Sequence, residues 1–495
     1  MPFTGNTTTI KVSPQGISPT YNETIIVLES TNIAQDNFQW GVEIWVDGLP
    51  NGLLTTKIST LVITPNPDGF GVIDVQRHIE NYITSTFQPA DLGTMGTAED
   101  SFRVWSLNVT EYFDNYTWDF DYNTNDGLEV AFINVGEDHY FEIGDEVTIQ
   151  QDGSPTYPAY DGVSTILRVP TTDSITIDKL FLGATGSEPG TATGNKTVEV
   201  SQTTASSFLY KSFNGVINFA EFNSFTSDIY DMDASNPTAL FLTDIPNNYE
   251  LRRDDPLWIS GYTESLSFIT LQVVTDNGDF LINPISPVPP INDTYIIQSK
   301  VGYNDLLNTT STITVTSGSL PMVDPNTTFI NVTPKQGITT IGETKSFTVV
   351  DKCSKYENIK LFFLDRLGSY IPLNFDRVSK NNVTNERSNY KQNYGNYDSV
   401  ANAWGYTTHA RGTTTYDIVT TESITCTSDW LDDEQVELMH ILLTSPDVYY
   451  IDEAGVYRAV TITTNSFEKK KRVSEKLLNY TITFEYANNN TNQRG

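Results

Sequence analysis

A short run in which apolar side chains point to both sides of the chain is the feature that most constrains this sequence. Residues 359–364 read Ile-Lys-Leu-Phe-Phe-Leu, and an alternation of this kind predicts a strand that is buried on both faces. The Leu-Gly-Ser sequence at 367–369 predicts a turn in which Gly368 takes a positive φ, and Tyr370–Phe375 predicts the returning strand. We therefore expect a β-hairpin at the centre of a β domain.

The composition extends this prediction to the whole chain. Thr, Asn, Val, Ile and aromatic residues are plentiful, whereas long runs of the strong helix formers Ala, Glu, Lys and Leu are absent. A chain of 495 residues is also too long for one hydrophobic core. The sequence predicts an all-β dominated fold, with several β-sandwich or barrel domains in series and a few short helices.

Turn signals and changes in strand spacing divide the chain into four expected domains. Short strands with Gly- and Pro-rich turns predict a small SH3-like barrel. We interpret this barrel as an insert in the first domain, because residues 215–222 resume a sequence pattern that the first domain would need for closure. The expected domains are an N-terminal β-sandwich with a short helix near 72–83 (1–135), the barrel insert (136–205), a second β-sandwich (206–350) and a C-terminal β domain with one helix at 428–445 (351–495).

The helix expected at 428–445 has the clearest boundaries. Ser428 or Asp429 can cap its start, acidic residues follow in the first turn, and Pro446 ends it. Apolar residues recur within it at helical spacing, so one of its faces is expected to pack against the β domain.

The charge is strongly negative and unevenly distributed. Lys and Arg number 29 against 62 Asp and Glu, a net charge of −33. Residues 1–350 hold 13 basic and 43 acidic side chains, whereas residues 351–495 hold 16 and 19. Such a surface repels phosphate backbones, so we expect no stable nucleic-acid binding. No apolar run approaches about 18 residues and no apolar leader is present, so we expect synthesis in a cytoplasm and no membrane insertion.

The residues that usually carry chemistry do not gather into a motif. Only two cysteines occur, Cys353 and Cys426, and the four histidines lie in separate segments. Neither a hydrolase motif nor a phosphate-binding loop is present, so the sequence predicts no cofactor, no metal and no enzymatic activity. A pair of carboxylates could be chosen from the 62 acidic residues without any pattern selecting it, which leaves a glycosidase as a minor alternative.

Residues 119–127 contain alternating Asp and Asn residues, as a calcium loop does. Counted from Asp121, however, the glycine falls at position seven, and Phe132 stands where a calcium loop has glutamate. We interpret the segment as an acidic turn, with weak calcium binding as the alternative.

Several motifs together carry a resemblance to a known class of protein. They are D-K-C-S-K-Y-E-N-I-K-L-F-F-L-D-R-L-G-S-Y (351–370), W-G-Y (404–406), R-G-T-T-T-Y (411–416), S-D-W-L-D-D-E (428–434), L-N-Y-T-I-T-F-E (478–485) and P-N-P-D-G-F-G-V-I-D-V (65–75). In these motifs the chain resembles virion structural proteins of tailed bacteriophages that infect Bacteroidota, the crAss-like phages or their relatives. The resemblance covers about two thirds of the chain, is densest after residue 345 and brings no catalytic residue with it.

The resemblance implies a tail, ring or hub component of the virion, present in several copies that contact one another and other tail or neck proteins. In a closed ring, one face of each copy meets a different face of its neighbour. We expect the nearly neutral residues 351–495 to contact the neighbours. The acidic remainder is then expected to face solvent or a lumen through which DNA passes.

The expected subunit contacts come from basic and aromatic residues of the last domain. Aromatic residues and Arg are enriched at protein interfaces. The candidates are Lys469, Lys470, Lys471, Arg472, Arg366, Tyr370, Tyr394, Tyr397 and Trp404.

A second class of function fits some of the same residues. The aromatic run from Tyr390 to Tyr406 would also suit a receptor-binding or carbohydrate-binding spike, because exposed rings offer a binding platform. The basic cluster at 469–472 could hold a phosphate group, although a solvated hairpin tip is the simpler interpretation.

Overall fold

The computed structural model confirms the predicted fold class. It is mostly β, with several separate sheets and only a few short helices. No helix in the described part of the chain is long and apolar enough to span a membrane. The structure describes residues 6–491 apart from 15, 49–52, 86, 88–94, 115–116, 127–128, 134–138, 154–157, 183–188, 195–196, 202–208, 223, 265–268, 284–294, 310–311, 353–354, 467–478 and 489.

The chain forms two compact units that are interleaved along the sequence. Unit 1 comprises Met1–Thr84, Phe102–Phe213 and Ala220–Ser227. Unit 2 comprises Ser85–Ser101, Asn214–Phe219 and Asp228–Gly495. Each unit is described by itself below.

Two of the sheets in unit 1 share one core. Trp40 is a buried residue of the larger sheet, and its ring packs against Gly71 of the smaller sheet. A side chain at position 71 would not fit, because its Cβ would lie 2.9 Å from the Trp40 ring. The smaller sheet is formed by β1 (Thr9–Val12), β3 (Ile25–Glu29) and β6 (Phe70–Asp74); the larger one has the order β2 (Ile17–Pro19), β17 (Leu209–Phe213), β8 (Phe102–Asp114), β4 (Asp36–Gly48) and β5 (Leu53–Ile63), with β16 (Val198–Ser201) also paired to β8.

Two details of unit 1 differ from the sequence-based expectations. The strand that follows the barrel and pairs with β8 is β17, whereas residues 215–222 contain only α2 (Phe219–Phe222). The helix expected at 72–83 is limited to α1 (Gln76–Ile79) and one 3-10 turn, because Ile73 still belongs to strand β6.

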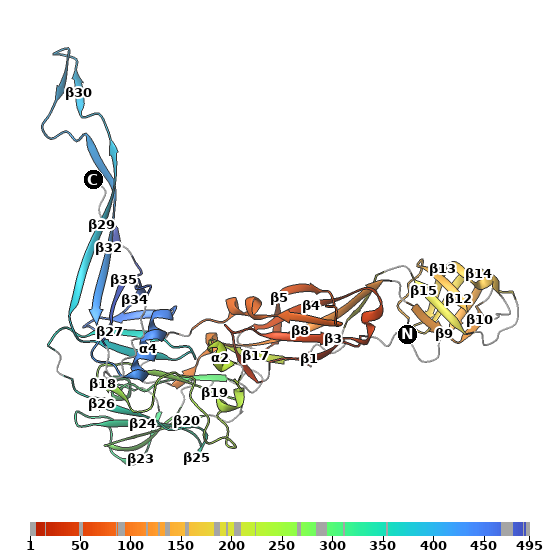
Figure 1. Ribbon diagram of the computed structural model, residues 1–495, viewed down its shortest axis with the longest axis horizontal. Helices are drawn as coiled ribbons and strands as arrows, with labels where there is room; N and C mark the ends of the chain where they lie inside the picture. Colours follow the sequence, from red (N-terminus) through yellow and green to blue (C-terminus); the bar gives the residue numbers. More distant parts are fainter. Residues whose placement is uncertain are drawn as a thin grey trace. The chain divides into compact units, whose positions relative to one another are not determined.

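The remaining strands of unit 1 form a barrel. In the strand order its two end strands, β9 and β10, are joined by the single residue Asp121, so the sheet must curl until its ends meet. Figure 1 shows the resulting barrel in yellow and orange. Its order is β10 (Tyr122–Asp126), β11 (Glu129–Ile133), β14 (Ser174–Leu180), β13 (Gly162–Thr171), β12 (Glu146–Gln151), β15 (Gly190–Gly194) and β9 (Thr117–Phe120). The barrel therefore starts before residue 136 and includes strands that we assigned to the N-terminal sandwich.

Unit 2 contains two larger sheets and the helices α3 (Tyr303–Leu307) and α4 (Asp433–Thr444). The first sheet has the order β18 (Tyr249–Arg252), β26 (Lys345–Val350), β24 (Phe329–Gln336), β20 (Thr270–Thr275), β21 (Gly278–Asn283) and β23 (Thr312–Gly318), with β25 (Thr339–Thr340) paired to β24. The second has the order β29 (Ser379–Lys391), β32 (Thr413–Thr427), β35 (Thr481–Tyr486), β34 (Tyr457–Ile462), β33 (Val448–Ile451), β27 (Ile359–Leu364), β28 (Tyr370–Phe375), β19 (Trp258–Thr263), β22 (Tyr295–Lys300) and β7 (Met95–Thr97), with β36 (Asn490–Thr491) paired to β32.

The predicted central hairpin is present with the predicted boundaries. β27 pairs with β28, and all six residues of β27 are buried, as the double-sided apolar run predicts. Gly368 lies in the turn with a φ of +94°. β27 and β28 lie in the same sheet as β19 and β22, so one sheet draws strands from both sides of the boundary expected at residue 350.

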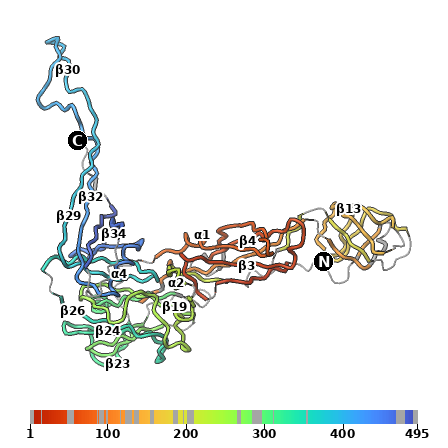
Figure 2. Tube along the Cα trace, in the orientation of Figure 1, coloured from red at the N-terminus to blue at the C-terminus, as the bar shows by residue number. Residues whose placement is uncertain are grey.

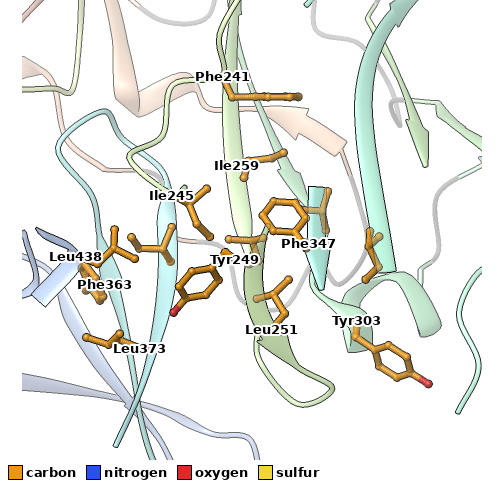
Figure 3. Packing of buried hydrophobic residues seen from close by; sticks show 14 of the residues in the cluster. Phe241, Ile245, Tyr249, Leu251, Ile259, Tyr303, Phe347, Phe363, Leu373 and Leu438 are labelled. Atoms are coloured by element: carbon orange, nitrogen blue, oxygen red, sulfur yellow. The ribbon is translucent and has the colours of Figure 1, made fainter. Parts of the chain in front are cut away.

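The two faces of this hairpin contribute to two cores. Phe363 and Leu373 belong to the large core of unit 2, together with Leu438 of α4, and Figure 3 shows these three side chains close to one another. On the opposite face, Phe362 and Tyr370 pack with Trp258 in a smaller aromatic cluster. The hairpin is therefore the inner layer of unit 2.

Helix α4 starts later than the sequence indicates. Asp432 is its N-cap and accepts a hydrogen bond from Gln435 N, while the Gln435 side chain accepts one from Asp432 N. This capping box fixes the start at Asp433, so the prediction of Ser428 or Asp429 as the cap is wrong. Asp429 instead forms an ion pair of 2.6 Å with Arg377.

Candidate functional site

The most distinctive surface of unit 2 is a long two-stranded extension. β29 and β32 pair from Ser379 and Cys426 at one end to Lys391 and Thr413 at the other. Near its base, β32 also pairs with β35 and β36, up to Val419. Residues 387–418, which we call the ribbon, have only each other as strand partners in the described part of the chain. Figures 1 and 2 show the ribbon in light blue.

The ribbon forms strands although its sequence lacks apolar alternation. Twelve of the 13 residues of β29 are exposed, so neither face of this strand is buried. Polar side chains link the two strands, since Thr415 Oγ1 donates to Asn389 Oδ1 at 2.6 Å and Gln392 Nε2 donates to Thr414 Oγ1 at 3.0 Å. An isolated two-stranded hairpin is marginally stable in water. The two strands of the ribbon would therefore gain stability if another molecule covered them.

A second, smaller hairpin forms the end of the ribbon. β30 (Gly395–Asp398) pairs with β31 (Ala403–Tyr406). Asp398 Oδ1 accepts hydrogen bonds from Val400 N at 2.8 Å and from Ala401 N at 3.2 Å, and these bonds lower the pKa of the Asp398 carboxyl. Val400 is 95% exposed, so the turn holds an apolar side chain in solvent at the tip.

Six exposed aromatic rings lie along the ribbon. The Tyr394 and Tyr406 ring centroids are 5.2 Å apart, and the Trp404 ring stands at 75° to the Tyr406 ring at 6.5 Å. Gly395 permits this arrangement, because a Cβ there would collide with the Trp404 indole nitrogen. Each ring is between 45% and 65% exposed: Tyr390, Tyr394, Tyr397, Trp404, Tyr406 and Tyr416.

The ribbon also differs from the rest of the chain in charge. Residues 387–418 carry the basic side chains Arg387, Lys391 and Arg411 and the acidic side chains Asp398 and Asp417. This gives a net charge of +1 in a chain whose net charge is −33. The ribbon is thus less acidic than the rest of the chain, and its exposed aromatic rings suit burial against another protein surface.

The structure brings three of the candidate contact residues together on the ribbon and leaves two others apart. Tyr394, Tyr397 and Trp404 lie on or beside the terminal hairpin. Arg366 lies in the β27–β28 turn, where its guanidinium is partly exposed and pairs with Asp244 at 2.5 Å. The cluster Lys469, Lys470, Lys471 and Arg472 lies outside the described residues.

Tyr370 does not lie on the surface, contrary to our expectation. Its side chain is fully buried in the aromatic cluster around Trp258, and its hydroxyl donates to Asp447 Oδ2 at 2.6 Å. Burial and the Asp447 carboxylate raise the pKa of this hydroxyl, so it remains a donor. Tyr370 therefore stabilises the interior of unit 2 and has no surface to offer a neighbouring subunit.

A polar pocket of about 350 Å³ lies where β32 joins β34 and β35. Arg458 is held in it by Asp452 at 2.9 Å, and Glu422 is the only carboxylate among its described lining residues. A glycosidase needs two carboxyl groups on either side of the bond that it cleaves. The described lining residues are Thr420, Glu422, Tyr457, Arg458, Ala459, Tyr486 and Asn488.

Metal ligands do not gather in the described part of the chain, where no group of three or more His, Cys, Asp or Glu side chains could hold an ion. The acidic segment at 119–127 lies partly outside the described residues. Comparison with protein-family models gave no match, and comparison with curated proteins found no significant relative.

Proposed function

We propose that this chain is a structural component of the tail or neck of a tailed bacteriophage, where copies contact one another in a ring. The motifs that resemble phage virion proteins support this proposal, as does the series of β domains. The proposed partners are other copies of the chain and other tail or neck proteins. The ribbon is the observation that carries the proposal furthest.

The ribbon has the properties of a surface that is completed by a partner. A Tyr or Trp side chain buries about 150–250 Å² in an interior, so a ring that is half exposed has about 100 Å² left to bury. At about 25 cal/mol per Å², each ring would contribute about 2.5 kcal/mol before the cost of ordering is subtracted. Six such rings are exposed on the ribbon, which is ample for a stable protein interface.

Deletion of the ribbon tests the proposal. Glu386 and Val419 are paired directly, so an Asn-Gly turn can replace residues 387–418 and keep the rest of the sheet paired. We expect the full-length chain to form ring-shaped oligomers in negative-stain electron microscopy and the shortened chain to stay folded but monomeric. Mass spectrometry of purified particles should find the chain at several copies per virion. A full-length chain that stays monomeric and is absent from particles would refute the proposal.

A second candidate function is a receptor-binding or carbohydrate-binding spike. The observation that favours it is the group of Tyr394, Trp404 and Tyr406 at the end of the ribbon, since exposed rings can also stack on a sugar. A glycan array discriminates the two functions. Strong binding by the full-length chain that is lost in Trp404→Ala, without any change in oligomeric state, would favour the spike.

A further inference from the structure

A lysine lies buried at the open end of the β27–β28 hairpin. Lys360 of β27 is only 4% exposed, and it is paired directly with Asn374 of β28. Residues that stand directly opposite each other in an antiparallel pair carry their side chains on the same face, with Cβ atoms about 5 Å apart. The Lys360 amine and the Asn374 amide therefore share the face of the sheet that also carries Phe362 and Tyr370.

A buried carboxylate connects these two side chains. Asn374 Nδ2 donates to Asp255 Oδ2 at 2.8 Å, and Lys360 Nζ lies 3.5 Å from Asp255 Oδ1. Asp255 is fully buried, and its Oδ1 accepts no hydrogen bond from the described residues. Burial raises the pKa of the Asp255 carboxyl, so this group takes up a proton more readily than an exposed aspartate does. One oxygen of Asp255 thus faces the amine, and the other holds the amide.

The carbonyl oxygen of the same amide has a donor of its own. Asn358 Nδ2 donates to Asn374 Oδ1 at 2.7 Å. A donor at this oxygen stabilises the negative charge that forms there when a nucleophile attacks the carbonyl carbon. The cluster therefore holds an amine, a carboxyl that can transfer protons, an amide and a donor to the amide oxygen, which are the parts that acyl transfer requires.

We propose that Lys360 and Asn374 form an intramolecular isopeptide bond, and that Asp255 transfers the protons of this reaction. The Lys360 ammonium passes one proton to Asp255, and the neutral amine attacks Asn374 Cγ. Asp255 then gives this proton to Asn374 Nδ2. The Cγ–Nδ2 bond breaks, ammonia leaves, and a second proton passes from Lys360 Nζ to Asp255. The third proton stays on Nζ as the hydrogen of the new amide, and nothing is oxidised or reduced.

A simple buried ion pair explains the cluster less well. Lys360 Nζ lies 2.6 Å from Asp254 Oδ2 and also donates to the Asp254 carbonyl oxygen at 2.6 Å. Asp254 alone neutralises the ammonium, so an ion pair gives no reason to bury a second carboxylate, which costs free energy. Proton transfer between the amine and the amide gives Asp255 such a reason. The Asp254 side chain is 65% exposed, so water weakens its hold on the ammonium.

The bond would change how the hairpin opens. It joins β27 to β28 at the end of the hairpin that lies away from the turn, so these strands could not separate there without breaking a covalent bond. The turn that contains Gly368 lies inside the closed loop of residues 360–374, and it remains free to open by itself.

Trypsin digestion of the full-length protein tests the bond directly. In an unmodified chain, trypsin releases residues 356–360 and residues 367–377 as separate peptides, because it cleaves after Lys355, Lys360, Arg366 and Arg377. Trypsin does not cleave after an acylated lysine. The bond therefore leaves residues 356–366 joined to residues 367–377 in one branched peptide, whose mass is one ammonia below that of the two peptides together.

We expect the branched peptide in mass spectra of protein that has been kept folded for several days. Separate linear peptides overturn the inference and leave the proposed function standing. Loss of ammonia without a branched peptide, as cyclisation of an asparagine produces, also overturns it.

The two neighbouring aspartates provide matched variants. Asp255→Asn keeps the size of the side chain but removes the group that transfers protons, so the branched peptide should form about 100-fold more slowly. Asp254→Asn removes only the exposed partner of the ion pair and should leave the branched peptide in place. Equal yields of the branched peptide from these two variants overturn the assignment of Asp255. Lys360→Arg keeps the positive charge and should abolish the bond. The digest of the unaltered chain decides the inference whether or not the variants fold.

Discussion

Replacement of Asp365 by alanine should open the β27–β28 hairpin, because this carboxylate organises the turn. Asp365 is buried, and its Oδ1 accepts hydrogen bonds from Leu367 N at 3.0 Å and from Ser369 N at 2.8 Å. Its Oδ2 accepts from Thr243 Oγ1 at 2.8 Å and from Asp244 N at 2.9 Å. The alanine variant leaves at least the two buried turn amides without an acceptor.

The magnitude follows from those two amides. A buried donor that loses its acceptor costs about 1–3 kcal/mol, so the pair costs about 2–6 kcal/mol. A difference of about 1.4 kcal/mol changes an equilibrium constant about tenfold. Local opening of the hairpin should therefore become at least ~30-fold more frequent in Asp365→Ala.

A second turn in unit 2 provides a matched control. Asp452 Oδ1 accepts from Ala454 N at 3.0 Å and from Val456 N at 2.9 Å, and Gly455 has a positive φ of +77°. Ala454 and Val456 are exposed, whereas the corresponding residues of the first turn are buried. Water can replace the lost carboxylate in Asp452→Ala, so this variant should cost less than about 1 kcal/mol.

Hydrogen exchange measured by mass spectrometry on the full-length protein reports both openings separately. Peptides that cover residues 359–375 and 448–462 contain the two turns. The reasoning is refuted if Asp365→Ala changes the exchange of its own turn by less than about tenfold, or if Asp452→Ala has an equal effect.

Three further outcomes can be measured. Burial raises the pKa of Asp305 to about 7, so between pH ~5 and ~7 the folded state keeps a proton on this carboxyl that the unfolded state has lost. The contribution of Asp305 to the unfolding free energy should therefore fall by about 3 kcal/mol as the pH rises through that window. Asp305→Asn should remove this share of the pH dependence in urea titrations, whereas the share of Asp365, whose pKa burial also raises to about 7, should remain. Gly368→Ala places a Cβ 2.9 Å from the Asn214 carbonyl oxygen, whereas Gly455→Ala meets nothing within 4 Å, so the first should destabilise more by at least about 1 kcal/mol in the same titration. Burial raises the pKa of the Cys426 thiol, so iodoacetamide should label its peptide only after unfolding, and rapid labelling of the native protein would contradict the structure.

The core of unit 2 could be predicted from sequence because burial leaves a periodic pattern. In residues 359–364, apolar side chains occupy both odd- and even-numbered positions and so point to both faces of the strand. The structure buries both faces. The start of α4 could not be predicted in the same way, since Ser428, Asp429 and Asp432 are all suitable caps by residue type. A tertiary ion pair from Arg377 to Asp429 and a local capping box at Asp432 decide between them.

The ribbon strands left no such signal. β29 buries neither face, so its sequence has no reason to alternate, and only pairing with β32 makes it a strand. The aromatic residues could be found from sequence, but residue type alone does not separate an exposed tyrosine from a buried one. Tyr394 and Tyr370 were equivalent candidates by type, and the partner Asp447, 77 residues beyond Tyr370, places the second in the interior.

The interleaving of the two units governs how the protein can be made and dissected. β7 lies in a segment that interrupts unit 1, yet it pairs with β22, where Thr97 meets Ile297. During synthesis, the ribosome must add some two hundred residues after β7 before β22 is available to pair with it. Unit 2 is therefore completed late in synthesis. A fragment that begins at Asp228 would lack β7 and the buried Met95, and no single proteolytic cut would release either half intact.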